Sequence, residues 1–517
     1  MKCWAITVGL LLWAGRPAAQ AIIYAPDAIM AKAYTDFEVI GKSGEQYVLY
    51  RKGVGNDYLL YCNEQLQVQQ RVPLFSQKKQ ARPIAFLAHP SGVHLFATYP
   101  HNNWQYITAA FVNNRNFTVS EAQVLDSFPL LRTGASRFYP VKSKLGDQLA
   151  LFRVNRGTRS GLLYLDLIFF DATRQAARSV RLRFPSFAAS NNIEAVELAD
   201  NGNLFFVVAG RSRQGGYIEQ LVFYELPAGS STLHVKRVPL FALYPERVLL
   251  HVNNRQQTCT LVAFASAHIK GNVDALFTAA VKMGADGAVT TAAYRFSDRE
   301  RQLANSKVST EIAFNDYYIT DVVAKADGGL LVVAESLNTA ARETNINRWQ
   351  RPFPDGWNNT LSGPLNFSEQ EQKKSVAYGA IESDYTPTIF MNRTDAGERY
   401  FNAENLLLVS LNEAAAINEV KFFNKVQQSN IAAEVSFAAL RRNDALLLFY
   451  NEWVPGTGVV PQGVLIKSNL AMERLPVIRG LQPGYRLLYR LAVQVSNHEL
   501  LLPAVYKNRY VLAMLRY

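Results

Sequence analysis

A short turn followed by an apolar run recurs along almost the whole chain, and this repetition constrains the fold more than any other feature. The turns contain Gly, Asn, Asp or Ser, and equivalent turns are about 47 to 56 residues apart except on either side of residue 330, where the spacing is longer. The apolar runs are 46–50, 94–97, 148–152, 203–208, 258–264, 330–333, 445–450 and 499–502. One period therefore describes eight units.

Each unit contains room for four short strands. A strand precedes the turn, as at 84–88 and 193–198, so the apolar run is the second strand of its unit. A third and a fourth strand follow, for example 217–225 and 233–240 in the fourth unit. Short antiparallel strands that are rich in β-branched and aromatic residues and joined by such turns are typical of propeller blades. The sequence therefore predicts an all-β chain that forms a β-propeller with eight blades.

One segment repeats letter for letter. Residues 71–75 and 237–241 both read Arg-Val-Pro-Leu-Phe, and each closes the last strand of a unit. They are 166 residues apart, which is three periods of about 55. This match is in phase with the turn pattern and supports eight units. Seven blades plus an extra hairpin is the alternative interpretation.

The last unit ends with the strand-like segment 510–517 and is one strand short. An unpaired edge would present free backbone N–H and C=O groups. We therefore predict that residues 22–25 supply the missing strand and close the ring.

The N-terminus has the pattern of a secretory signal. Lys2 precedes an apolar run over 4–14, and Ala-Gln-Ala ending at Ala21 is typical of a cleavage site. A run of about 11 residues is too short to cross about 30 Å of hydrocarbon, and no later segment is apolar for about 18 residues, so no transmembrane span is expected. The sequence predicts a signal peptide over 1–21 and a single propeller domain over 22–517. Its location would be the periplasm, the cell surface or the extracellular space.

Composition and motifs exclude several classes of protein. A chain with 49% hydrophobic and 19% charged residues can bury a large core and is not mainly disordered. The net charge is +12, but Lys and Arg are scattered, so no nucleic-acid partner is expected. No metal, nucleotide or serine-hydrolase motif occurs, and neither a metal nor a cofactor is expected. Cys62 and Cys259 have strand-like surroundings that favour two separate core positions, although one disulfide is the alternative.

Residues 337–402 interrupt the sixth unit between its second and third strands, and they are rich in Asn, Pro and aromatics. Long loops on a rigid β scaffold often carry function, because the scaffold fixes their ends. The other interpretation is a cap over one blade whose aromatic side chains are buried for stability. The candidate binding residues in this insertion are Trp349, Phe353, Trp357 and Tyr378.

The second strands of four units end in charged residues: Arg153, Arg211, Glu335 and Glu452. If these strands line one end of the central channel, the four side chains would form a charged mouth. The favoured interpretation is that opposite charges pair or stay solvated, which contributes about 0–1 kcal/mol when they are exposed. No residue is assigned a catalytic role.

The later units also show a family resemblance. The run 330–333 followed by Glu335, the segments 405–410 and 420–427, and the run 446–450 followed by Asn451-Glu452 resemble the closing blades of uncharacterised secreted β-propeller proteins from Gram-negative bacteria. The resemblance covers most of the chain after residue 21 and rests on the style of the repeat. It implies the fold and an envelope or extracellular location, and it implies no activity and no functional residues.

Two hypotheses about function follow. The first is a non-enzymatic binding or scaffold protein that recognises a protein or a glycan through the insertion and one propeller face. The second is a hydrolase or lyase that acts on an extracellular polymer, with its site at the channel. The absence of a catalytic motif favours the first but does not exclude the second, because propeller enzymes can gather residues from separate blades. The sequence does not specify an oligomeric state.

Overall fold

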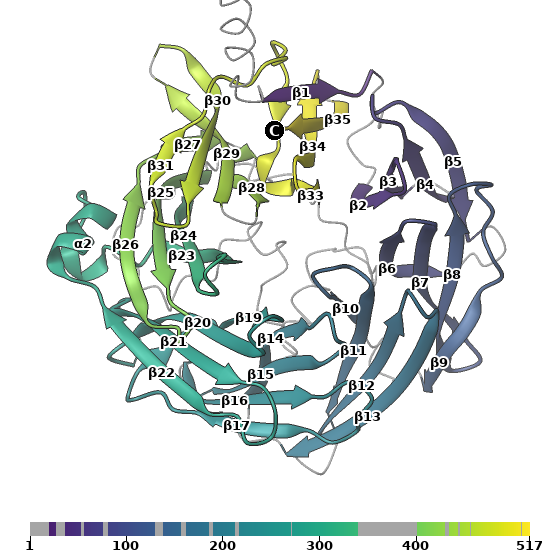
Figure 1. Ribbon diagram of the computed structural model, residues 1–517, viewed down its shortest axis with the longest axis horizontal. Helices are drawn as coiled ribbons and strands as arrows, with labels where there is room; N and C mark the ends of the chain where they lie inside the picture. Colours follow the sequence, from purple (N-terminus) through teal and green to yellow (C-terminus); the bar gives the residue numbers. More distant parts are fainter. Residues whose placement is uncertain are drawn as a thin grey trace, which may run out of the picture.

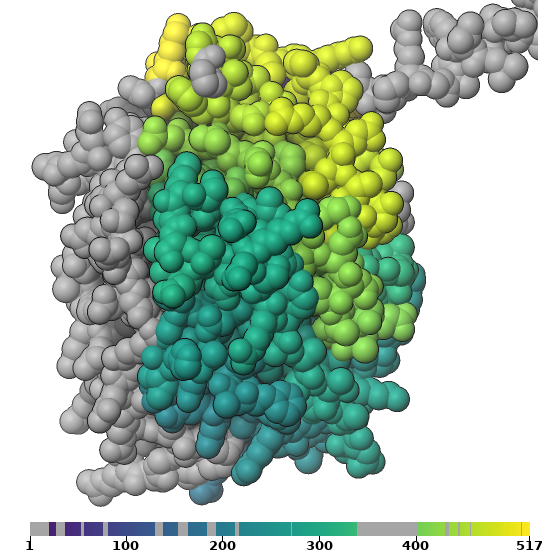
Figure 2. All heavy atoms as spheres, turned by 90° about the vertical axis from the view of Figure 1, so that its left-hand side faces the viewer, coloured from purple at the N-terminus to yellow at the C-terminus, as the bar shows by residue number. Residues whose placement is uncertain are grey.

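Eight antiparallel sheets are arranged radially around one axis in the computed structural model (Figure 1). Seen from the side, the later blades follow one another in chain order from teal through green to yellow (Figure 2). The structure describes residues 20–26, 37–52, 56–75, 81–129, 138–156, 162–185, 190–211, 217–269, 271–339, 401–429, 434–442, 445–454, 456–507 and 509–517.

The first four blades are meanders in which each strand pairs with the next. Blade 1 contains β2 (Phe37–Ser43), β3 (Gln46–Arg51), β4 (Asp57–Cys62) and β5 (Val68–Leu74). Blade 2 contains β6 (Arg82–His89), β7 (Gly92–His101), β8 (Trp104–Asn113) and β9 (Gln123–Pro129). Blade 3 contains β10 (Tyr139–Lys142), β11 (Gln148–Arg156), β12 (Leu162–Asp171) and β13 (Ala176–Pro185). Blade 4 contains β14 (Ser190–Leu198), β15 (Leu204–Arg211), β16 (Ile218–Leu226) and β17 (His234–Val238).

Three of the remaining blades carry an extra short strand. Blade 5 contains β18 (Tyr244–Pro245), β19 (Leu249–Asn253), β20 (Thr258–Ser266), β21 (Ala275–Lys282) and β22 (Val289–Arg295). Blade 6 contains β23 (Tyr317–Ala324), β24 (Leu330–Thr339), β25 (Phe401–Leu411), β26 (Ile417–Phe423) and β27 (Gln427–Ser429). Blade 7 contains β28 (Phe437–Arg441), β29 (Ala445–Val454), β30 (Gly458–Lys467) and β31 (Met472–Arg474). Blade 8 contains β32 (Arg486–Leu487), β33 (Val493–Ser496), β34 (Glu499–Tyr506), β35 (Arg509–Arg516) and the N-terminal β1 (Ala21–Tyr24).

The meander gives the ring two distinct faces. The first strand of each blade is nearest the axis (Figure 1). Because neighbouring strands run in opposite directions, the turns between first and second strands all lie at one end of the ring, which we call face A. The connections between second and third strands lie at the other end, which we call face B. All eight apolar runs predicted from the sequence are second strands, as expected.

The apolar sides of successive blades pack against each other, so the hydrophobic core consists of eight interblade layers. Between blades 1 and 2, for example, Val48 and Leu59 pack with Phe86 and Leu95. Equivalent layers join all the remaining pairs of neighbouring blades, including blade 8 with blade 1. The apolar runs are fully buried because each blade is covered on both sides, which explains why the sequence shows continuous runs in place of strict alternation.

The N-terminal strand closes the ring, which confirms the eight-bladed prediction and its closure. β1 pairs antiparallel with β35, and Ile22 lies opposite Leu515. The backbone N–H of Ala25 also donates to the carbonyl oxygen of Leu512 at 2.8 Å. Since every one of the eight sheets is a blade, the alternative of seven blades plus a hairpin is wrong.

The literal repeat extends to backbone conformation. Residues 71–74 end β5 and residues 237–238 end β17, which are the outermost strands of blades 1 and 4. The two equivalent phenylalanines, Phe75 and Phe241, both have positive φ, at 58° and 49°. Left-handed backbone is uncommon for a bulky residue, so the shared conformation shows that the two segments leave their blades in the same way.

Two long connections depart from the regular pattern. Between blades 5 and 6 lies a short helix, α2 (Asp298–Ala304), in which Ser297 and Glu300 form a capping box. In blade 6, β24 pairs directly with β25, and residues 340–400 between them lie outside the described ranges.

The two cysteines are free and fully buried in different interblade layers. Cys62 on β4 packs between blades 8 and 1, whereas Cys259 on β20 packs between blades 4 and 5. The favoured interpretation of two separate core positions is therefore the one that the structure shows.

Candidate functional site

The four charged residues predicted at the second-strand ends lie on four blades, and each is engaged in an ion pair. Arg153 and Arg211 have separate acidic partners, whereas Glu335 and Glu452 both act electrostatically on Lys425. The structure therefore brings the two glutamates to one region around Lys425 and places each arginine in a pair of its own.

Arg153 joins blades 2 and 3. Its Nε and Nη2 atoms donate to Asp166 Oδ2 at 3.1 and 2.7 Å. Its guanidinium lies over the rings of Phe128 and Phe138, with centroid distances of 4.1 and 5.3 Å. Burial lowers the pKa of Arg153, and the hydrogen bond and charge of Asp166 oppose that effect. The Arg153 side chain is therefore buried, and it stabilises the contact between blades 2 and 3.

Arg211 pairs with a residue that a β-bulge turns inward. The register of β14 against β15 shifts between Ile193 and Ala195, so Glu194 is the extra residue. Arg211 donates to Glu194 Oε1 from Nε at 3.0 Å and from Nη2 at 2.7 Å, and it reaches the carbonyl oxygen of Glu246 in blade 5 at 3.0 Å. Burial raises the pKa of Glu194, and the positive charge of Arg211 counteracts this shift. The pair itself lies within blade 4, and the hydrogen bond from Arg211 to Glu246 links blades 4 and 5.

Glu335 belongs to a buried network between blades 6 and 7, which we call the blade 6–7 cluster: Glu335, Lys425, Gln427 and Ser436. The Glu335 Oε1 and Lys425 Nζ atoms are 2.5 Å apart, and both side chains are fully buried. The Ser436 hydroxyl donates to Glu335 Oε2, and Gln427 exchanges two 3.0 Å hydrogen bonds with the Ser436 backbone. Burial lowers the pKa of Lys425, while the charge and hydrogen bond of Glu335 raise it.

Glu452 has a looser partner. Its carboxylate lies 3.4 Å from the guanidinium of Arg474, whose side chain is exposed. The four aromatic candidates of the insertion, Trp349, Phe353, Trp357 and Tyr378, lie outside the described residues.

Sequence reasoning missed a second polar group, in which side chains from the inner strands of several blades meet near the axis. We call it the axial cluster, and its members are Lys144, Glu197, His251, Asp321 and Arg441. The Lys144 Nζ atom is 3.1 Å from His251 Nε2 and donates to the carbonyl oxygen of Val252 at 2.6 Å. Lys144 follows β10 of blade 3 and His251 lies on β19 of blade 5, so this contact joins two blades that are not neighbours in the ring.

Arg441 of blade 7 completes the axial cluster. Its Nη2 atom is 2.6 Å from Asp321 Oδ2 of blade 6. Burial, followed by the positive charges of Lys144 and Arg441, lowers the pKa of His251 to about 3. Burial raises the pKa of Glu197 to about 7, although the charge of Lys144 opposes this. His251 is therefore neutral at neutral pH, whereas Glu197 titrates there.

Polar contacts at face A continue from blade to blade. The backbone N–H of Leu145 donates to Asp200 Oδ1 at 3.0 Å, and Asn254 Nδ2 donates to Asp200 Oδ2 at 2.6 Å. Gln494 of blade 8 exchanges two 2.9 Å hydrogen bonds with the backbone of Arg441. These hydrogen bonds link blades 3, 4 and 5, and blades 7 and 8, beside the axial cluster.

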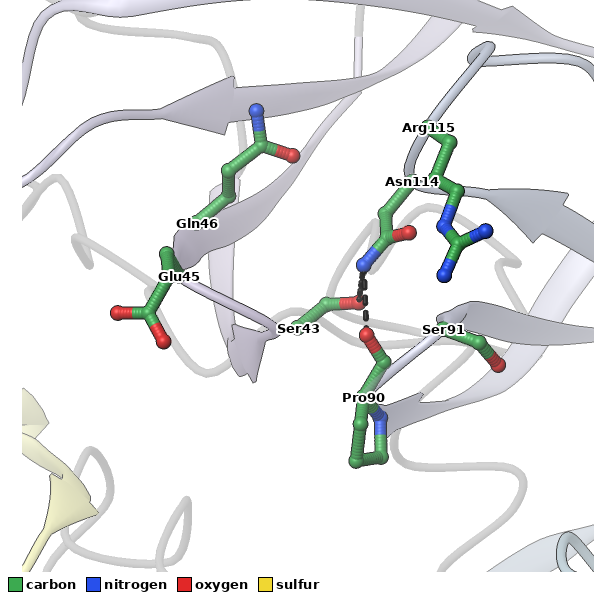
Figure 3. A pocket seen from close by; sticks show the side chains of 7 residues that line it. All are labelled: Ser43, Glu45, Gln46, Pro90, Ser91, Asn114 and Arg115. Atoms are coloured by element: carbon green, nitrogen blue, oxygen red, sulfur yellow. Dashed lines mark hydrogen bonds between the residues drawn. The ribbon is translucent and has the colours of Figure 1, made fainter.

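A hollow of about 550 Å³ opens on face A between blades 1 and 2 (Figure 3). Its centre is fixed by Asn114, whose Nδ2 atom donates to the carbonyl oxygen of Pro90 at 2.6 Å. Seven residues line it: Ser43, Glu45, Gln46, Pro90, Ser91, Asn114 and Arg115. Both charge signs, from Glu45 and Arg115, are present, so the lining favours no single charge of ligand.

Within the described residues, no group of three or more His, Cys, Asp or Glu side chains could hold a metal ion. In the same part of the chain, no helix has the length and apolar character needed to cross a membrane.

Comparisons with known proteins find solved structures of low sequence identity. No family model and no curated protein matches it. Similar solved structures include the WD40 domain of SCAP from fission yeast, at 8% identity and a TM-score of 0.38, covering 96% of this chain and 98% of that domain. Another is the β-propeller domain of the Trilobed protease from Pyrococcus furiosus, at 10% identity and a TM-score of 0.36, covering 84% and 93%. A third is prolyl oligopeptidase B from Galerina marginata, at 8% identity and a TM-score of 0.40, covering 92% of this chain and 56% of that one.

Proposed function

We propose that this protein is a non-enzymatic binding or scaffold β-propeller that recognises a protein or a glycan through one face of its ring. One observation carries the proposal: Arg153, Arg211 and Glu335 are enclosed in ion pairs within their own blades, and each of the three side chains also contacts the neighbouring blade. Charged groups used in this way stiffen a frame and do not present reactive atoms to a substrate. A rigid frame keeps the entropic cost of binding low, which suits recognition through loops at its faces.

The proposal includes export to the cell envelope or beyond, as the N-terminal pattern and the resemblance to secreted propellers of Gram-negative bacteria suggest. Cleavage after Ala21 would leave Ile22 as the first residue, and Ile22–Tyr24 would still pair with β35. Expression of the tagged full chain in a Gram-negative bacterium, followed by fractionation and N-terminal sequencing, tests this step. A mature protein that starts at Ile22 outside the cytoplasm is expected, and an unprocessed cytoplasmic chain would contradict export.

The binding function is tested by affinity capture from envelope fractions with the intact protein and with a variant that lacks residues 340–400. The expected result is a partner that the intact protein retains and the shortened variant loses, while both show the same thermal unfolding midpoint. Equal recovery of every partner would exclude the insertion as the recognition element.

A hydrolase or lyase that acts on an extracellular polymer is the second candidate. The observation in its favour is the axial cluster, because a carboxyl group with a pKa of about 7 can serve as a general acid. Incubation of the protein with soluble polysaccharides and a reducing-end or unsaturated-product assay tests it. Cleavage that Glu197→Gln abolishes would establish the enzyme and displace the binding proposal.

A further inference from the structure

The central hairpin of blade 2 is longer than the strands that face it. β7 and β8 have ten residues each, whereas the neighbouring β3 and β4 of blade 1 have six each. On the side of this hairpin that meets blade 1, Val93, Leu95 and Val112 fill the interblade core. Among the described residues of blade 1, no strand is as long as β7 or β8.

At face B, this side of the hairpin carries four aromatic rings. Cross-strand partners and every second residue share one side of a sheet, so Tyr99, His101, Trp104 and Tyr106 follow the core residues on the same side. We call these four residues the aromatic ledge. Trp104 is 43% exposed, His101 is exposed, and the two tyrosines are half-buried. The ledge therefore presents aromatic surface where the interblade core ends.

The rings are held in place before any ligand binds. Tyr99 and Tyr106 stack with centroids 5.2 Å apart and planes at 13°. The ring of His101 lies 6.4 Å from that of Tyr106. At the tip, Asn102 and Asn103 have φ of 49° and 65°, which forms the tight two-residue turn that Asn favours and that matches the twist of a hairpin.

The chemistry of the ledge favours a neutral ligand with both apolar and hydroxyl-bearing edges. Residues 99–106 contain no Lys, Arg, Asp or Glu, so neither an anionic nor a cationic ligand finds an opposite charge in this segment. The faces of Trp and Tyr rings are electron-rich and attract the C–H groups of a pyranose ring. The exposed amides of Asn102 and Asn103 offer donors and acceptors for sugar hydroxyl groups.

We propose that the aromatic ledge binds a neutral polysaccharide, with sugar rings on Trp104 and Tyr106 and hydroxyl groups on the tip amides. This rests on the proposed binding function and specifies its ligand class and its place on face B. The connection between β24 and β25, which holds the sequence-predicted binding residues, leaves blade 6 at the same face.

The test is calorimetric titration of the intact protein with cellohexaose, chitohexaose and maltohexaose, and with dextran sulfate and anionic phospholipid vesicles for comparison. The expected result is binding of at least one neutral hexasaccharide, weakened about tenfold or more by Trp104→Ala. Trp453→Ala is the matched control, because Trp453 is 48% exposed and ends the second strand of blade 7 at the same face. The Trp453→Ala variant is expected to bind the same hexasaccharide as tightly as the wild type does.

Three outcomes would overturn the ledge. They are no binding of any neutral hexasaccharide, equal binding by the Trp104→Ala variant, and Trp104-dependent binding of the sulfated polymer or of vesicles in place of neutral sugar. Trp104→Phe keeps an aromatic face and is expected to retain most of the affinity, and thermal unfolding midpoints verify that each variant folds. Sugar binding that survives Trp104→Ala leaves the proposed binding function standing and moves the site elsewhere. Cleavage of the hexasaccharide contradicts the binding function itself.

Discussion

Single side chains in this ring show how burial decides the role of a charge. Arg153, Glu194 and Glu335 lie on separate blades, yet each is enclosed and hydrogen-bonded to an opposite charge. An enclosed pair adds little net stability, because desolvation of the two ions offsets their attraction. Removal of one partner is costly, because the other charge is left buried and alone.

The blade 6–7 cluster gives the sharpest test of this asymmetry. Glu335→Gln is expected to lower the free energy of unfolding by about 3–5 kcal/mol, because Lys425 would keep a buried positive charge without a counter-ion. The measurement is the thermal or urea unfolding midpoint of each variant. The double variant Glu335→Gln, Lys425→Met is expected to recover most of the loss. A double variant as unstable as the sum of both single changes would contradict the pairing.

Glu197 of the axial cluster predicts a pH dependence. Its pKa in the folded protein, about 7, exceeds the ordinary value of 4.5. Between those values the folded protein binds more protons at this site than the unfolded chain does, so its contribution to stability falls as the pH rises from about 5 to 7. Glu197→Gln removes that loss. The measured quantity is the free energy of unfolding of the variant minus that of the wild type. We expect this difference to be about 1–3 kcal/mol larger at pH 8 than at pH 5.

Unfolding midpoints at both pH values measure the effect of Glu197→Gln. Glu219→Gln is the control, because Glu219 is an exposed carboxylate on β16. The same pH trend in both variants would show that Glu197 is not the responsible group.

At the scale of strands, the sequence predicts most of what the structure contains, and the physical reason is the regular punctuation by turns. Second strands such as β20 and third strands such as β21 are long and apolar, and turns that contain Gly or Asn lie a few residues from their ends, so their positions follow from the pattern. The first strands are harder to predict from the sequence. Bulges shift the register of β2, β6, β14 and β23, and a shift by one residue moves side chains to the other side of a strand.

The same irregularity explains why the axial cluster could not be predicted. Its members come from first strands and their turns, and a contact such as that between Lys144 and His251 joins residues more than one hundred positions apart. The second-strand charges were visible in the sequence, but their acidic or basic partners lie on other strands at distances that no local pattern fixes. A systematic comparison of polar residues in all eight first strands would have been the usable signal.

The closing strand supports a prediction about β1. A chain that begins at Phe37 lacks β1, exposes the edge of β35 and loses the burial of Ile22, which is 5% exposed. We expect a loss of at least about 3 kcal/mol and a tendency to associate through the free edge. Unfolding midpoints and light scattering measure both effects. A chain that begins at Ile22 is the control and is expected to match the full protein, and a stable, monomeric chain that begins at Phe37 would contradict the closure.

At the scale of the molecule, the ring behaves as one unit because no blade has a hydrophobic core of its own. Each apolar layer is built from two neighbouring blades, and the layer between blades 8 and 1 makes the series circular. A local opening therefore exposes two layers at once. Groups inside the layers should become accessible only when the whole ring opens, in contrast to linear repeat proteins, whose ends can fray.

The two buried thiols report on this directly. Cys62 and Cys259 are in layers that share no blade, and burial raises the pKa of Cys62 to about 12 and that of Cys259 well above its ordinary value. Both therefore stay protonated and shielded at pH 8, where only thiolates react. In a chain that begins at Ile22, we expect almost no reaction with Ellman's reagent in the native state and two thiols per chain in denaturant. The native reaction should follow the rate of global unfolding. Fast labelling of one cysteine would reveal independent opening of its layer, and a missing pair of thiols after unfolding would reveal a disulfide that the separate layers do not allow.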